Sequence, residues 1–181
     1  MRSTGARGFT IVEVLVLICI IGVLSGFTVV SKELIRKAYV TSITKELYAD
    51  LQLARMNAIT QGGLGFGIRF ESPTSYVLFQ FNDCDNDHDY DADACDGSRE
   101  ETVIFRKSMP ASVVLTKTNQ ATSFGNEIVI FDQFGIPRRT NWGLGMMTIL
   151  VRNEPDSGSI KCVSISMNRV KEASWNGSSC I

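Results

Sequence analysis

The sequence predicts an α+β fold, in which one long N-terminal helix is followed by a head of antiparallel β-strands. Three observations favour this class. Residues 9–30 are almost uncharged and apolar, residues 34–59 repeat apolar side chains at helical spacing, and every later apolar run is short and bounded by turn residues. A helix followed only by strands is typical of α+β proteins rather than of alternating α/β units.

The first expected element is the segment FTIVEVLVLICIIGVLSGFTVV, residues 9–30, whose one charged residue is Glu13. A helix of about 20 apolar residues spans a bilayer, so we expect this segment to lie in a membrane. It is too long for the apolar region of a secretory signal. A charge inside a membrane helix costs about 2.5–3.5 kcal/mol, so Glu13 is expected to have a partner or a function.

The helix is expected to continue beyond the apolar segment. Apolar residues recur at three- and four-residue steps as far as Ile59, and Gly62-Gly63 predicts the helix end, so the predicted helix covers residues 9–61. Residues 62–181 then form the expected head, packed on the second half of this helix. Seven strands are predicted in it, at residues 65–70, 76–81, 102–106, 113–116, 127–131, 147–152 and 161–167.

Length and composition limit the function. The chain has 181 residues, enough for one domain with a substantial core. Its 18 Lys and Arg against 19 Asp and Glu give a formal net charge of −1, which excludes a uniformly basic nucleic-acid binder. His88 is the single histidine. It lies in an acidic stretch, so the sequence offers no Ser-His-Asp or Cys-His set outside that stretch, and we expect a protein that is not an enzyme.

Four of the five cysteines lie in the polar part of the chain, in two close pairs. Neither pair has the C-x-x-C spacing of zinc or redox sites, so the spacing favours disulfides. Four cysteines allow three connectivities, of which we favour Cys84–Cys95 and Cys162–Cys180. Disulfides indicate an oxidising compartment, which places the expected head in the periplasm or outside the cell.

An acidic loop, NDCDNDHDYDADACD at residues 82–96, contains seven aspartates and no Lys or Arg. Counted from Asp85, its carboxylates occupy positions 1, 3, 5, 7, 9 and 12 of an EF-hand-like calcium loop: Asp85, Asp87, Asp89, Asp91, Asp93 and Asp96. Tyr90 replaces the usual glycine of that loop, and its last ligand is Asp rather than Glu. Two interpretations remain open, a structural Ca²⁺ site or a solvated loop closed by a disulfide. No other cofactor is expected.

Three stretches carry a resemblance to a known family. The residues RGFTIVE, at positions 7–13, resemble the leader junction of type IV prepilins and type II secretion pseudopilins. The helical stretch ELYADLQLARMNAI, residues 46–59, is similar to that of GspH/FimT-type pseudopilins and minor pilins. The segment FDQFGIP, residues 131–137, is similar to the one before their last strands. The resemblance implies a pilin-like fold.

The resemblance also implies a processing route. Residues 1–8 would be a leader that a prepilin peptidase removes by cutting between Gly8 and Phe9, after which the amine of Phe9 is methylated. Glu13 would then help to dock the subunit into a growing filament, because the new amine is a natural partner for a buried carboxylate on a neighbouring subunit. One departure from the family is the absence of a proline late in the apolar segment.

The function that follows is structural: a minor type IV pilin that helps to initiate or cap pilus assembly. Its partners would be other minor and major pilins, contacted through the N-terminal helix. The protein would lie in the inner membrane with its head in the periplasm, and then in the extracellular pilus. A minor pseudopilin of type II secretion, in a periplasmic pseudopilus, is the alternative.

A third hypothesis for the function is a pilin that binds DNA for uptake. Asn168-Arg169-Val170-Lys171 resembles a Gly-Arg-x-Arg motif of DNA-uptake members of the family, with Asn in place of Gly and Lys in place of the second Arg. On an extended strand Arg169 and Lys171 would project from one face, where both can contact phosphates. The competing interpretation is the ordinary solvated face of a final hairpin.

Overall fold

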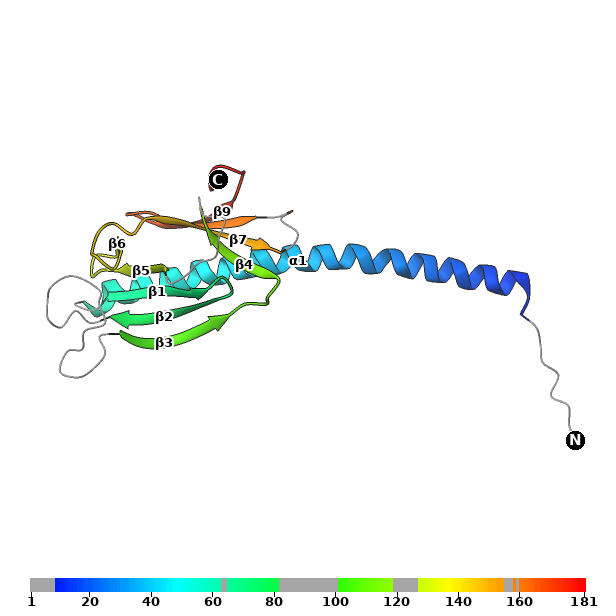
Figure 1. Ribbon diagram of the computed structural model, residues 1–181, viewed down its shortest axis with the longest axis horizontal. Helices are drawn as coiled ribbons and strands as arrows, with labels where there is room; N and C mark the ends of the chain where they lie inside the picture. The colour runs from blue at the N-terminus through cyan, green and yellow to red at the C-terminus, as the bar shows by residue number, and fades with distance from the viewer. Residues whose placement is uncertain (1–8, 63–64, 82–100, 119–126, 155–157, 159) are drawn as a thin grey trace, which may run out of the picture. The chain divides into compact units, whose positions relative to one another are not determined.

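The computed structural model describes residues 9–62, 65–81, 101–118, 127–154, 158 and 160–181, with the side chains of residues 26–33 also left out. The chain forms two compact units, Met1–Ala38 and Tyr39–Ile181. Helix α1, Ile11–Gln61, contributes residues to both units. Figure 1 shows this helix and the strands that follow it.

Helix α1 begins and ends where local signals place it. Thr10 precedes its first residue, and the backbone N–H of Glu13 donates to Thr10 Oγ1 over 3.3 Å, so Thr10 caps the helix. Gly62 follows its last residue with φ +35°, a conformation that glycine adopts readily at helix ends. The second half buries a stripe of residues three or four apart: Val40, Ile43, Leu47, Leu51, Ala54 and Ala58.

The head contains two antiparallel sheets, which form two layers beside the second half of α1 (Figure 1). The first has the strand order β3-β2-β1-β5-β6 and the second has the order β4-β7-β8-β9. Their bounds are β1 Gly65–Ser72, β2 Ser75–Phe81, β3 Glu101–Ser108, β4 Val113–Lys117, β5 Glu127–Phe131, β6 Pro137–Arg138, β7 Met147–Asn153, β8 Lys161–Ile165 and β9 Val170–Ser174. This arrangement confirms the α+β class.

One hydrophobic core joins the helix and both sheets. The buried stripe of α1 packs with inward side chains of the five-stranded sheet, such as Phe70 and Tyr76, and of the four-stranded sheet, such as Ile149 and Val163. The sheets alternate inward and outward residues, so both can present an apolar face to the same helix. Burial of this shared core provides the main favourable term for folding of the head.

The five-stranded sheet has a second apolar cluster on its other face. Phe79, Phe81 and Ile130 are fully buried there, and Trp142 packs against Phe81 with ring centroids 6.0 Å apart. Glycine makes room for these rings on β1, because a Cβ at Gly67 would lie 2.8 Å from the Phe79 ring and 2.4 Å from a backbone oxygen. The sheet therefore buries apolar side chains on both faces.

All seven predicted strands are present, with small differences at their ends. Two strands were not predicted: the two-residue β6, which the sequence suggested was part of a turn, and β9. The predicted strand 161–167 ends at Ile165, because Ser166 and Arg169 form the turn of the β8–β9 hairpin. The acidic loop, residues 82–96, lies outside the described residues.

Candidate functional site

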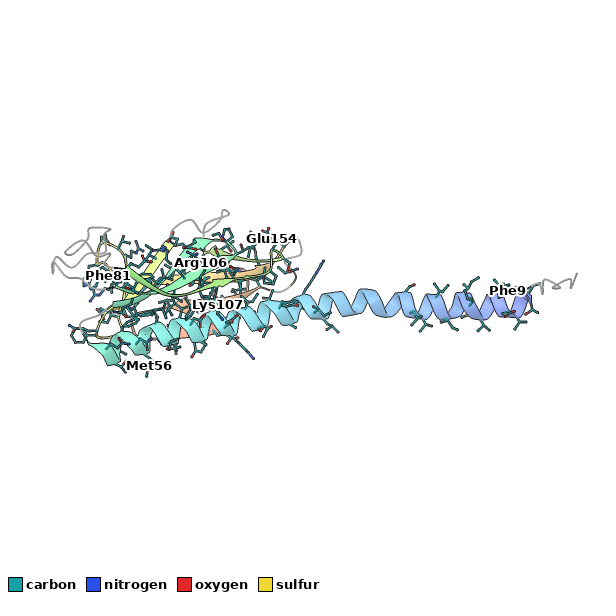
Figure 2. All side chains as sticks on the ribbon, turned by 90° about the horizontal axis from the view of Figure 1, so that it is seen from below. Phe9, Met56, Phe81, Arg106, Lys107 and Glu154 are labelled. Atoms are coloured by element: carbon teal, nitrogen blue, oxygen red, sulfur yellow. A yellow bond between two sulfur atoms is a disulfide. The ribbon has the colours of Figure 1, made fainter. Side chains whose placement is uncertain are left out.

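The start of α1 presents the first group of predicted functional residues. Phe9 lies just before the helix and is 75% exposed (Figure 2). Glu13 occupies the first turn and is also exposed. A carboxylate there is favoured by the partial positive charge of the helix N-terminus. Gly8, on the other side of the predicted cleavage point, lies outside the described residues.

Large apolar side chains from Ile11 to Leu24 are exposed around this part of the helix. Cys19, in the middle of them, is a free thiol. So continuous an apolar surface is typical of a segment that another phase or another chain covers. In the part of the chain that the structure describes, no helix combines the length and the apolar character needed for a membrane span.

In the head, two polar contacts tie α1 to the five-stranded sheet. The ammonium of Lys107 on β3, the residue labelled in Figure 2, donates to Glu46 Oε1 on the helix. Tyr76 on β2 donates its hydroxyl to Asp50 Oδ2 over 2.7 Å. We call Glu46, Asp50, Tyr76 and Lys107 the helix–sheet cluster.

Burial and hydrogen bonding shift three pKa values in the helix–sheet cluster. Partial burial raises the pKa of Asp50 above 3.8, although the Tyr76 hydrogen bond and the Lys107 charge oppose the rise. Burial, together with the hydrogen bond to Asp50, raises the pKa of Tyr76 well above 10.0, so this hydroxyl remains a donor. The hydrogen bond to Glu46 raises the pKa of Lys107. The cluster therefore keeps its donors protonated at neutral pH.

The FDQFGIP segment is a tight loop that contacts α1. Asp132 is buried; its Oδ1 accepts from the backbone N–H groups of Phe134 and Ile136, each over 2.9 Å, and its Oδ2 accepts from Arg138 Nε over 2.9 Å. Gly135 has φ +70°, and a Cβ there would lie 2.8 Å from Ile59 Cδ1. The glycine thus serves both the turn and the close approach to the helix.

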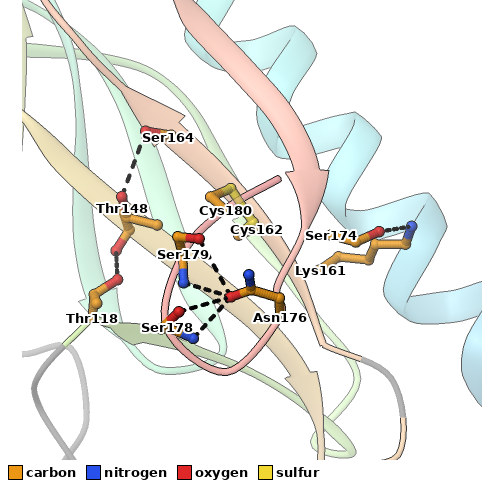
Figure 3. The surroundings of a disulfide bond; sticks show 10 residues. All are labelled: Thr118, Thr148, Lys161, Cys162, Ser164, Ser174, Asn176, Ser178, Ser179 and Cys180. Atoms are coloured by element: carbon orange, nitrogen blue, oxygen red, sulfur yellow. Dashed lines mark hydrogen bonds between the residues drawn. A yellow bond between two sulfur atoms is a disulfide. The ribbon is translucent and has the colours of Figure 1, made fainter.

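The C-terminal segment is closed by the disulfide Cys162–Cys180, which confirms that predicted pairing (Figure 3). Its two Cα atoms lie 6.0 Å apart. Within the closed segment, Asn176 Oδ1 accepts hydrogen bonds from the backbone N–H groups of Ser178 and Ser179 (Figure 3). The last residues of the chain therefore have a defined conformation on the four-stranded sheet.

The predicted cationic pair lies on the β8–β9 hairpin. Arg169 is in the turn, Lys171 is on β9, and both are exposed on either side of the buried Val170. Arg169 lies one residue before the start of β9, so only Lys171 is a strand residue. Within the described residues, neither cation forms an ion pair.

The predicted calcium ligands, Asp85 to Asp96, and the predicted disulfide Cys84–Cys95 lie outside the described residues. In the described ranges, no three His, Cys, Asp or Glu side chains converge as metal ligands would. Both predictions remain open.

Sequence reasoning missed the helix–sheet cluster. One signal was available: Asp50 follows Leu47 by three residues and so lies beside the buried stripe, where a carboxylate needs a hydrogen-bond donor. Nothing in the sequence identified Tyr76 as that donor.

Comparisons with known proteins agree with this architecture. The family model described as type II transport protein GspH matches residues 44–169. No sequence of a curated protein matches the chain.

Solved structures give the same result for the fold. Two structures of the minor pseudopilin EpsH from the type II secretion system of Vibrio cholerae are 12% identical, with TM-scores of 0.53 and 0.51. They cover 79% and 75% of this chain, and 99% and 97% of their own. The type IV minor pilin FimU from Pseudomonas aeruginosa has a TM-score of 0.47 at 13% identity, covering 73% of this chain and 90% of its own. With most of its length matched by the family model, the chain belongs to the GspH family of pseudopilins and minor pilins.

Proposed function

We propose that this protein is a minor type IV pilin, a structural subunit rather than an enzyme, which helps to initiate or cap a pilus. The observation that carries the proposal is the exposed apolar surface of α1 from Ile11 to Leu24. Such a surface needs a covering. The inner membrane would cover it before assembly, with the head in the periplasm, and the helices of neighbouring pilins would cover it in the extracellular filament.

Processing would prepare the helix for this role. A prepilin peptidase would cut between Gly8 and Phe9, and methylation of the Phe9 amine would follow. The cut creates a positive charge four residues before Glu13. In an apolar bundle neither charge is stable alone, so Glu13 would pair with the Phe9 amine of an adjacent subunit and set the depth at which the subunit enters the filament.

The test is Glu13→Gln, which removes the charge and keeps the size of the side chain. The variant should accumulate in the inner membrane at normal levels, because deletion of a charge makes insertion easier. It should be depleted at least several-fold from sheared filaments, whereas Glu13→Asp should retain part of the function. Filament incorporation of Glu13→Gln at the wild-type level would refute the docking role.

The alternative is a minor pseudopilin of type II secretion. It is supported by the description of the matching family and by the fold similarity to EpsH. The disulfide Cys162–Cys180 is compatible with both alternatives, because disulfides persist in the periplasm as well as outside the cell. Deletion of the gene separates the two: loss of surface pili with normal protein secretion supports the pilin, and the reverse result supports the pseudopilin.

DNA binding is a second candidate function, favoured by the exposure of Arg169 and Lys171 on one hairpin. So small a cationic patch would bind weakly, without sequence preference, and with a steep salt dependence. Binding of random-sequence DNA by the full chain in a mild detergent should fall between about 50 and 200 mM salt. Equal binding by a variant with both cations changed to Gln would exclude this site.

A further inference from the structure

A small cavity opens where the two sheets meet at one end of the head. Its volume is about 140 Å³. Lys117, the last residue of β4, and Glu127, the first residue of β5, line it and form an ion pair with Nζ and Oε1 2.9 Å apart. Each side chain of the pair is about a quarter exposed. The pair therefore links β4 of one sheet to β5 of the other beside the cavity.

A second cation, Arg139, lines the same cavity from the loop that follows β6. Its backbone is held in place, because its N–H donates to Gly143 O over 2.8 Å and its carbonyl accepts from Trp142 N–H over 3.0 Å. The side chain is exposed, and no ion pair of Arg139 occurs among the described residues. Among the described residues that line the cavity, two cations and one anion give a net charge of +1.

Among the other described lining residues, three apolar side chains can contact a short aliphatic group. Ile128, Met146 and Met147 contribute apolar surface, and Thr140 lies beside Arg139. Methionine side chains adapt to the shape of what they contact. At about 30 Å³ per water, the cavity has room for roughly four or five water molecules, which is the size of a small side chain rather than of a drug-like ligand.

We propose that this cavity binds a carboxylate on a short apolar stem, namely a glutamate side chain presented by a protein partner. The guanidinium of Arg139 would hold the carboxylate through paired hydrogen bonds, and the stem would lie against the two methionines. A single negative charge balances this net charge, whereas a phosphate dianion would exceed it and would be repelled by Glu127 about twice as strongly as a carboxylate monoanion. This site belongs to the head, and its test does not depend on the assembly role proposed above.

The test uses the full chain in a mild detergent, with isotope-labelled methionine methyl groups observed by NMR. The probe is N-acetyl-glutamate amide, and the matched control is the neutral N-acetyl-glutamine amide. Only the glutamate probe should shift the Met146 and Met147 signals in a saturable way, with a dissociation constant in the millimolar range. Arg139→Gln should weaken binding by about tenfold or more, and Lys45→Gln, which removes an exposed cation on α1, should leave it unchanged.

Four results would overturn the proposal. The first is the absence of a saturable shift up to about 100 mM of the glutamate probe, which would exclude a dissociation constant in the millimolar range. The second is an equal response to the glutamine probe, which would show that charge plays no part. The third is an Arg139→Gln variant that binds as tightly as the wild type. Tighter binding of inorganic phosphate than of the glutamate probe would also reject the carboxylate assignment.

Discussion

The helix–sheet cluster predicts a specific loss of stability in Tyr76→Phe. The substitution keeps the buried ring and removes only the hydroxyl that donates to Asp50 over 2.7 Å. Tyr76 is 1% exposed, so the ring itself should remain packed against α1. What changes is one hydrogen bond between the helix and β2.

The magnitude follows from the chemistry of this bond. A hydrogen bond to a charged group contributes about 1.5–3 kcal/mol. In a chain of this size, such a loss lowers Tm by about 3–12 °C. We therefore expect a clear shift in thermal unfolding, followed by tryptophan fluorescence on the full chain in a mild detergent.

The effect should also depend on pH. Because the pKa of Asp50 is raised in the folded protein, its contribution to stability is fully present below the unfolded pKa of about 3.9. That contribution is lost as pH rises through the folded pKa. The Tyr76 bond favours the carboxylate and limits this loss, so removing it raises the folded pKa of Asp50 further. Tyr76→Phe should therefore be more destabilising at neutral pH than at about pH 4.

Asp50→Asn is the matched control, because the amide oxygen can still accept from Tyr76 while the titrating charge is gone. Its stability should change little at neutral pH, and the pH dependence of the Tyr76→Phe effect should disappear in the double variant. If Tyr76→Phe unfolds like the wild type, or loses the same stability at both pH values, the reasoning about this cluster is wrong.

Three further predictions concern the leader, the loop after β5 and the acidic segment. Gly8→Val should block processing, because a bulkier side chain obstructs the peptidase; mass spectrometry should find a protein eight residues longer, and normal maturation would contradict the predicted leader. Gly135→Ala should destabilise the head by about 1–3 kcal/mol in urea unfolding, because φ is positive and the new Cβ meets Ile59. Adding Ile59→Ala to the Gly135→Ala chain should recover part of this loss, because the new Cβ no longer meets the Ile59 side chain. If the losses of unfolding free energy from the two substitutions simply add, the contact between the two residues is unimportant. Millimolar Ca²⁺ should raise the Tm of the full chain by an amount that grows with concentration, an effect that Asp85→Asn with Asp87→Asn should remove; an unchanged Tm would indicate a solvated loop.

Much of the fold was predictable because its signals are local. The predicted helix, residues 9–61, differs from α1 by two residues at its start, since apolar periodicity and Gly62 are both read along a few neighbouring residues. β9 was missed because it is an edge strand with a single buried apolar residue, Val170, so its sequence VKEAS lacks the apolar pattern of a core strand. β6 is two residues long and begins with Pro137, which the sequence suggests as a turn.

The contacts that join these elements were harder to predict from the sequence. Glu46 and Lys107 lie 61 residues apart, and Asp50 and Tyr76 lie 26 apart. Which side chains meet depends on the register of β2 and β3 against the helix, and a shift of one residue would turn Tyr76 to the other face. The cavity beside Arg139 brings together segments of both sheets, so no single stretch of sequence contains its pattern.

The disulfide Cys162–Cys180 has a mechanical consequence. A force that pulls on helix α1 and is resisted at the head would stretch the chain between these two points. The bridge joins residues 18 apart in sequence. The segment between them, roughly 60 Å long when fully extended, therefore cannot be pulled out while the bridge is intact. Even in a partly unfolded head, β8, β9 and the C-terminus would stay within one covalently closed loop. Only reduction of the disulfide would allow this loop to extend.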